Sequence, residues 1–249
     1  MYNLRSGLFK RIIPSILRKN FFFQKNQIIN LSFCKIRLNL SNSIDREIYL
    51  KGSYEKDQLN YLYKISKNEN IDAFLDIGSY IGYYSLFFRN LKNVHAFEPN
   101  KENFQILKIN NEINNANIIS HNIACSDTSK KSKLWYTDSN KMGGSSIYNE
   151  NDFELSKYKK KKLKFKTVYL KKLDDILNFR NKKLLVKIDV ERHEINVLKG
   201  SIEILKNNKI ILQIEVHKDL EYKVFTFLKK NKFKLINSIG PDHYFKNYY

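Results

Sequence analysis

The spacing of apolar residues changes twice in the first third of the chain. Between Gln27 and Leu50 apolar and polar positions alternate, which is typical of half-buried strands that can form a hairpin. The alternating apolar residues are Ile29, Leu31, Phe33, Ile36, Leu38 and Leu40. From Glu55 to Lys67 the apolar residues recur at helical spacing and predict a helix, through Leu59, Leu62, Tyr63 and Ile65.

Beyond residue 72, short apolar runs alternate with helical patterns. The sequence predicts strands at 73–77, 94–97, 117–124, 184–190 and 210–216, and helices at 83–89, 102–114, 194–205 and 220–230. Residues 233–239 and 243–245 are expected to close the sheet as an antiparallel hairpin around Gly240 and Pro241. Strands that alternate with helices form mostly parallel sheets covered on both faces. The expected fold is therefore α/β, with a mostly parallel seven-stranded sheet.

Two segments stand apart from this alternation. Residues 1–50 are expected to form a basic N-terminal extension with short strands, ahead of an α/β domain over residues 51–249. Within the extension, Leu8 to Leu17 can form a basic amphipathic helix, which either touches a membrane surface or packs on the protein's own core. Residues 128–180 interrupt the domain as an excursion, in which Gly143 to Ser146 form either a lid or a plain surface turn.

Charge and cysteine content narrow the class of protein. The formal charge is +20, which fits either a phosphate-bearing or anionic partner, or a sequence that is simply rich in lysine. The lysines are dispersed, apart from a dense run at Lys157 to Lys166, so the second interpretation is favoured and no specific nucleic acid partner is expected. Cys34 and Cys125 form no CxxC motif, which argues against a disulfide framework or zinc site and favours a cytoplasmic location.

One strand–turn–helix segment carries the pattern of a cofactor site. Asp76 ends a predicted strand, and Gly78 and Gly82 follow in a turn where a ligand can approach the backbone. Glu98 ends the next strand, where an acid can bind ribose hydroxyls. A carboxylate at Asp76 would repel a pyrophosphate and attract a cofactor that carries an ammonium and a sulfonium. The alternative is that Asp76 only caps the following helix.

These motifs, taken in order with several others, resemble those of FkbM-type methyltransferases, which are Rossmann-like and depend on S-adenosylmethionine. The resemblance covers roughly residues 50–240. It rests on residues 76–85 (DIGSYIGYYS), Ala96 to Asn100 with Asn103, Ala124 to Asp127, Gly144 and Ser145, Leu173 to Asp175, Lys187 to Glu191 with Glu194, and Val197 to Gly200. It implies a methyltransferase domain over residues 51–249 that transfers methyl groups from S-adenosylmethionine, usually to oxygen and often on a sugar or glycan.

The resemblance also implies roles for single residues. It adds Asn103 and Asp127 to the cofactor-binding set of Asp76, Gly78, Gly82 and Glu98. The chain departs from the family at Ser79 and Tyr80, where Ala-Asn is usual, and at Arg192, where glycine is usual. A positive side chain at position 192 is expected to narrow or recharge the acceptor pocket.

The acceptor side of the site is predicted from strand ends. In open α/β sheets the site lies beyond the carboxyl ends of the strands, and two adjacent ends supply Asp189, Glu191, His193, Glu215 and His217. Lys187 and Asp189 share one face of a buried strand, either as a structural ion pair or as an active-site pair with Asp189 toward the acceptor. His217 is the expected base, with His193 as its rival. No metal-ligand spacing accompanies these residues, so no metal is expected.

Three hypotheses on function follow. The first is an S-adenosylmethionine-dependent O-methyltransferase acting on a sugar, glycan or small-molecule hydroxyl, with Asp189, His217 and Lys187 as catalytic residues. The second is a nicotinamide-dependent oxidoreductase, which Asp76 and the glycine spacing disfavour. The third is an RNA-binding protein or RNA methyltransferase, which would need a continuous basic groove lined with aromatic residues. No such groove is evident in the order of residues along the chain.

Overall fold

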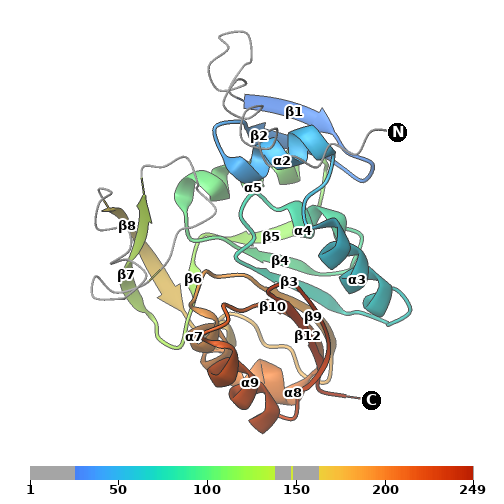
Figure 1. Cartoon of the computed structure of the whole chain (residues 1–249), viewed down its shortest axis with the longest axis vertical. Coiled ribbons are helices and arrows are strands. Elements are labelled where there is room, and N and C mark those ends of the chain that lie inside the picture. The colour runs from blue at the N-terminus through green and yellow to red at the C-terminus, as the bar shows by residue number, and fades with distance from the viewer. Residues whose placement is uncertain (1–25, 138–146, 148–162, 249) are drawn as a thin grey trace.

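The protein is built around a twisted seven-stranded sheet, which Figure 1 shows edge-on between two groups of helices. The computed structural model describes residues 26–137, 147 and 163–248. The expected N-terminal amphipathic helix, the loop from Gly143 to Ser146 and most of the lysine run from Lys157 to Lys166 lie outside the described residues.

The strand order of this sheet is β11-β12-β10-β9-β3-β4-β5. Neighbouring strands from β10 to β5 run parallel, whereas β12 is antiparallel to both β10 and β11. The strands are β3 (Ala73–Ile77), β4 (Val94–Phe97), β5 (Ile118–His121), β9 (Lys183–Ile188), β10 (Lys209–Glu215), β11 (Lys234–Ile239) and β12 (Asp242–Lys246). The mostly parallel sheet and the antiparallel C-terminal hairpin are confirmed.

Helices cover both faces of the sheet, and each face has its own apolar cluster. Side chains of α7 (Glu194–Lys199), α8 (Ile202–Asn207) and α9 (Glu221–Lys230) pack on one face. Side chains of α2 (Ser43–Lys51), α3 (Lys56–Ser66), α4 (Tyr83–Phe87) and α5 (Lys101–Ile113) pack on the other. This layering is what alternating strands and helices predict, because each strand of a parallel sheet must be buried on both sides.

The N-terminal hairpin is present, but the structure corrects its C-terminal end. Strands β1 (Asn26–Asn30) and β2 (Lys35–Asn39) pair antiparallel as expected. The alternation was expected to continue to Leu50, whereas residues from Ser43 onward form helix α2. The helix begins after Asn42 in an extended conformation and ends at Gly52 in the left-handed region, which are the usual start and stop signals of a helix. The proposed domain boundary at residue 50 stays a prediction.

The excursion after residue 124 forms a second, three-stranded sheet in the order β6-β8-β7. It contains β6 (Ala124–Cys125), β7 (Lys130–Thr137) and β8 (Leu163–Lys171), and the short helical turn η1 (Leu173–Asp175) follows it. The strand expected at 117–124 is therefore wrong as one element, since β5 and β6 belong to different sheets.

The helix expected at 194–205 is also divided, into α7 and α8, at Gly200. A side chain at Gly200 would place its Cβ 1.8 Å from the carbonyl oxygen of Ser126. Only glycine lets the chain pass so close to the start of the excursion, and the helix breaks there.

Candidate active site

A cavity opens at the carboxyl ends of β3, β4 and β9, where the two sheets approach each other. It encloses about 960 Å³ of empty space, counted out to its open mouth. Its charged lining residues are Asp76, Glu98, Lys187, Asp189 and Glu191, and tyrosines line one side through Tyr54, Tyr80, Tyr83 and Tyr84. This is the edge of an open α/β sheet at which ligands bind.

The glycine turn after β3 is shaped by close backbone packing. Gly78 has φ +85°, and a Cβ at this position would lie 1.7 Å from the carbonyl oxygen of Asp189. The backbone of the turn therefore touches the end of β9 directly. This contact places the predicted cofactor turn and the candidate catalytic carboxylate on one continuous wall.

Asp76 is buried behind this turn with one oxygen satisfied and one not. Its Oδ2 accepts hydrogen bonds from Ser85 N at 3.0 Å and from Ser85 Oγ at 2.6 Å. Its Oδ1 has no partner within the described part of the chain, and neither has the buried Ser79 Oγ beside it. Burial raises the pKa of Asp76, while Lys187 opposes the rise. A cation bound in the cavity would satisfy Oδ1 and stabilise the ionised carboxylate.

Glu98 is held in place by the backbone at the end of β4. Its Oε2 accepts a hydrogen bond from Tyr80 N at 3.0 Å, and its Oε1 accepts one from Asn100 N at 2.7 Å. Asn103 Nδ2 lies at the limit of hydrogen bonding, 3.5 Å from Oε1. Burial raises the pKa of Glu98 to about 8. The carboxylate is thus fixed at the cavity wall, in the position expected of a ribose-binding acid.

Polar side chains cross one face of the sheet in two adjacent rows. In the first row the strand register sets Asp76 beside Lys187 and Lys187 beside Gln213. In the second row, two residues further along the strands, lie Asp189, Glu215 and, paired with Glu215, Asp242. Because side chains two residues apart share a face, both rows lie on the face covered by α3 and α4. The sequence pattern of each strand alone shows only one or two of these residues.

An ion pair joins the two rows, and a carboxylate pair lies within the second row. Lys187 Nζ lies 2.9 Å from Asp189 Oδ2, and the attraction of Lys187 lowers the pKa of Asp189 against the effect of burial. Burial and the neighbouring Asp189 raise the pKa of Glu215 to about 9. Glu215 and Asp189 share a hydrogen bond, and the two carboxyl groups titrate as a coupled pair in which Glu215 holds its proton more tightly.

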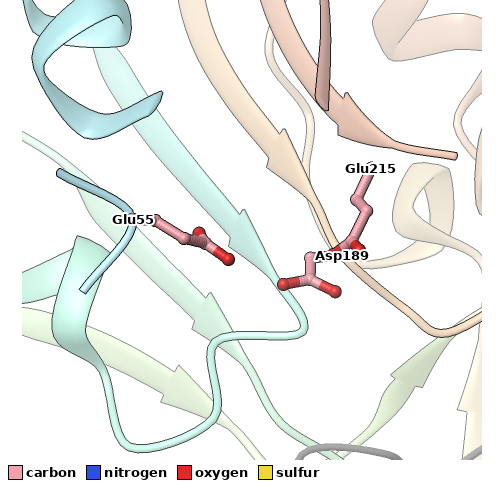
Figure 2. A group of neighbouring side chains, drawn as sticks. All are labelled: Glu55, Asp189 and Glu215. Atoms are coloured by element: carbon pink, nitrogen blue, oxygen red, sulfur yellow. The ribbon is translucent and has the colours of Figure 1, made fainter. Parts of the chain in front are cut away.

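A third carboxylate, from Glu55 at the start of α3, lies near this pair. Oxygens of Glu55, Asp189 and Glu215 lie within 4.8 Å of one another, and Figure 2 shows Glu55 pointing across toward Asp189. Glu55 Oε2 accepts a hydrogen bond from Tyr84 Oη at 3.0 Å. Three carboxylates can hold a metal ion, but the Lys187 ammonium already supplies the positive charge at this point. We therefore assign no metal to the cluster.

Glu55 was not predicted from the sequence as a site residue, and neither were Tyr54 and Tyr84. Glu55 stands at the start of α3 with φ +44°, and no spacing along the chain relates it to a strand end. Tyr84 lies in the first turn of α4, where its aromatic ring also covers the Lys187 ammonium at 4.6 Å. The left-handed backbone at Glu55, which is uncommon for a residue other than glycine, marks the position only once the structure is known.

The remaining predicted residues lie outside the cavity lining. Gly82 starts α4, and Asp127 accepts a hydrogen bond from Asn196 Nδ2 at 3.1 Å. His217 Nε2 lies 3.8 Å from Glu191 Oε2, and a hydrogen bond with Glu191 raises the pKa of His217. The roles proposed for these residues stay predictions.

His193 and Arg192 also point elsewhere. His193 Nε2 is 2.9 Å from Ser126 Oγ, and burial lowers the pKa of His193 to about 4. Arg192 has φ +75° and binds the carboxylate of Asp219 through both terminal nitrogens. Its guanidinium therefore neutralises an acid outside the cavity lining. Arg192 does not line the cavity, and its expected effect on the acceptor pocket stays a prediction.

Comparisons with known proteins agree with this geometry. Residues 76–237 match the family model described as the methyltransferase FkbM domain. No curated protein sequence matches the chain significantly. Within the described part of the chain, no helix is both long and apolar enough to cross a membrane.

Among solved structures, the chain is similar to methyltransferase FkbM from Methylobacillus flagellatus, with 15% identity, a TM-score of 0.49, and coverage of 71% of this chain and 44% of that one. It is also similar to M. jannaschii TYW2 in complex with AdoMet, with 15% identity, a TM-score of 0.48, and coverage of 91% and 86%. The chain thus spans less than half of the FkbM structure. At these scores the likenesses assign no acceptor. The family model, which covers most of the chain, shows that the protein belongs to the FkbM methyltransferase family.

Proposed function

We propose that the protein transfers the methyl group of S-adenosylmethionine to a hydroxyl oxygen of a sugar, glycan or small molecule. The observation that carries the proposal is the shared wall of the cavity, where the Gly78 turn touches the backbone of Asp189. The candidate cofactor residues and the candidate catalytic pair thereby face the same space, which also contains Asp76, Glu98 and Lys187. Such an arrangement brings donor and acceptor within reaction distance.

The cofactor half of the site fits a cationic, ribose-bearing ligand. The unpartnered Oδ1 of buried Asp76 supplies an acceptor for an ammonium, and Glu98 supplies a carboxylate for ribose hydroxyls. The cofactor, when bound, would supply an electrophilic methyl group on its sulfonium. A pyrophosphate, as in a nicotinamide cofactor, has no cation to offer the unpartnered Oδ1 of Asp76 and would be repelled by that carboxylate when it is ionised, so it is disfavoured.

The acceptor half of the site fits a hydroxyl. As the new C–O bond forms and the C–S bond breaks, the hydroxyl must lose a proton, which we assign to Asp189. Lys187 keeps Asp189 ionised, and Glu215 donates its hydrogen bond to the same carboxylate. An interaction that strengthens as the proton moves would act mainly on turnover.

The charge of the cavity supports an acceptor group without phosphate. Among the described residues that line it, four are acidic and one is cationic: Asp76, Glu98, Asp189 and Glu191 against Lys187. A phosphate beside the reacting hydroxyl would be repelled. A neutral sugar hydroxyl meets no such penalty, which favours the sugar or small-molecule acceptor over a nucleic acid held inside the cavity.

The direct experiment is to incubate the protein with S-adenosylmethionine carrying an isotopically labelled methyl group and panels of glycans, nucleotide sugars and small alcohols. We expect a mass increase of one labelled methyl group on a hydroxyl, lost in Asp189→Asn. Calorimetry with S-adenosylhomocysteine and NAD in parallel separates the oxidoreductase alternative. Binding of NAD alone would refute the proposed cofactor, and labelling of RNA alone would refute the proposed acceptor.

A further inference from the structure

The solvent-facing side of the three-stranded sheet carries aromatic and lysine side chains, with one threonine among them. Three cross-strand pairs of β7 and β8 make it up: Lys131 with Tyr169, Lys133 with Thr167, and Trp135 with Phe165. We call these six residues the aromatic platform. Alternate residues of the same strands, including Leu134, Val168 and Leu170, are buried on the other side.

Two of the three platform rings are exposed to solvent, and the third, Trp135, is half-buried. Phe165 is 49% exposed and Tyr169 is 53% exposed, and the Trp135 ring lies 5.1 Å from the Phe165 ring. Exposed apolar surface of this kind on a soluble domain marks a site of interaction when it is contiguous. Leu134, on the opposite side of β7, lines the active-site cavity, so the platform and the cavity are two faces of one sheet.

The lysines of the platform already lie over its rings. Lys131 Nζ is 5.7 Å from the Tyr169 ring centre, and Lys133 Nζ is 4.5 Å from that of Phe165. None of the six platform residues is acidic. Each ammonium is therefore held beside a flat ring, where it can meet an anion next to any group that stacks on that ring.

We propose that the aromatic platform binds single-stranded RNA, without base selectivity, by stacking bases on its rings and pairing phosphates with Lys131 and Lys133. Successive cross-strand pairs on one face are about 6.8 Å apart, two residues along a strand, so ring-bearing and ammonium-bearing pairs repeat at a spacing that an extended nucleotide chain can follow. Stacking platforms flanked by positive charge are the general device of single-strand binding. The net charge of +20 favours the approach of such a polyanion.

This binding surface is independent of the acceptor proposed for the cavity. The cavity lining is acidic and the platform is basic. The RNA is therefore assigned to the outer face of the sheet, and the methyl acceptor to the inner one.

Trp135 provides the test, because it is the only tryptophan of the chain. The full-length protein is titrated with a labelled oligouridylate and, separately, an oligoadenylate, while Trp135 fluorescence and oligonucleotide anisotropy are recorded together. We expect saturable quenching of Trp135 that coincides with the anisotropy change for both sequences. Phe165→Ala and Tyr169→Ala should each weaken binding about tenfold. Tyr222→Ala, which removes an 85% exposed tyrosine from α9, is the matched control and should change nothing.

The lysines are tested through salt. For single strands the slope of log K against log salt changes by about 0.7 for each phosphate contact, so Lys131→Gln with Lys133→Gln should reduce it by about 1.4. The control pair, Lys229→Gln with Lys230→Gln on α9, removes the same charge from exposed positions elsewhere. An equal loss in both pairs, without Trp135 quenching, would mean diffuse charge attraction and would overturn the proposal. Quenching by heparin or alginate but not by RNA would instead identify an acidic glycan as the ligand. Retained S-adenosylhomocysteine binding verifies that each variant is folded.

Discussion

Lys187 Nζ, on the buried strand β9, lies 2.9 Å from Oδ2 of Asp189, the residue that follows the strand. Pairing so close along the chain leaves the lysine free to face Asp76 on the neighbouring strand as well, and the strand register sets those two residues side by side. The positive charge is thereby shared between the cofactor half and the acceptor half of the cavity. Removing one partner of a buried ion pair destabilises a protein more than the pair stabilises it. For every substitution here, both activity and stability must therefore be measured.

Asp189→Asn is expected to lower turnover about 10²- to 10⁴-fold, the range for loss of a general base. S-adenosylhomocysteine affinity should stay near normal, because Asn keeps the size of the side chain at the cavity wall. Both quantities are measured on one preparation, with turnover followed by methyl transfer and affinity by calorimetry. Asp219→Asn, which removes an exposed carboxylate bound to Arg192, is the control. A lowered melting temperature with normal turnover would assign Asp189 a purely structural role.

His217→Gln is expected to lower turnover far less than Asp189→Asn does. The hydrogen bond with Glu191 raises the pKa of His217, so at neutral pH the imidazole carries more of its proton than a free histidine and is a poorer base. Steady-state rates of the two variants under identical conditions decide between the candidates. Comparable losses would restore His217 as a base and imply that it reaches the cavity during turnover.

Glu98→Ala should weaken S-adenosylhomocysteine binding by about 1.5–3 kcal/mol, the usual value of a hydrogen bond to a charged group. The fold should persist, since the side chain that is removed stands at the wall of the cavity and not within either apolar cluster. Calorimetry measures the loss and circular dichroism the fold. Glu102→Ala, four residues away on α5 and paired with Lys166, should bind normally. Equal affinity in both variants would leave Glu98 as a strand-end residue only.

Cofactor affinity should depend on pH through Glu98. The pKa of Glu98 is about 8 in the free protein, and a ligand that donates hydrogen bonds to the carboxylate lowers it. The affinity for the cofactor is therefore highest above about pH 8. It declines as the pH falls below 8, until the pH reaches the pKa of Glu98 in the complex. Titrations with S-adenosylhomocysteine from pH 6 to pH 9 test this. In Glu98→Gln the dependence in that window should vanish, and a slope that persists would place its origin in another group.

Gly78→Ala should destabilise the protein much more than Gly52→Ala. Both glycines have positive φ, so each alanine meets backbone strain of about 1–2 kcal/mol. The added Cβ at position 78 also collides with the carbonyl of Asp189, whereas nothing lies within 4 Å at position 52. The collision can be relieved only by separating β3 from β9. Thermal and urea unfolding of the two variants should differ clearly, and equal losses would contradict the close packing.

The strands and the cofactor turn could be predicted from the sequence where the local pattern and the tertiary packing agree. The buried strands β3, β9 and β10 appear as apolar runs of the right length, and Gly78 and Asp76 mark the turn after β3. The sequence interpretation failed where the alternation was extended too far. Residues 43–50 (SIDREIYL) have three polar residues between Ile44 and Ile48, and this spacing of four is that of the helix they form.

Contacts between distant segments account for the features that sequence reasoning missed. Glu55 reaches Asp189 only because α3 packs over the polar rows, and these residues are far apart along the chain. The aromatic platform depends on the register that pairs Trp135 with Phe165 across a long connection. No periodicity within either strand reports such a pairing, because a shift of one residue would turn every side chain to the other face.

The helices on the two faces of the main sheet should differ in how readily they unfold locally. The face beneath α3 and α4 carries the polar rows around Lys187 beside its apolar cluster, whereas the described residues beneath α7, α8 and α9 are mainly apolar, with His243 and Glu194 as buried exceptions. Amide hydrogen exchange should therefore proceed faster in α3 and α4, through local openings, than in the helices of the apolar face. A bound cofactor would satisfy Asp76 and slow exchange on its own side only. Cofactor binding could then be detected as slower amide exchange in one half of the molecule, even before any acceptor is known.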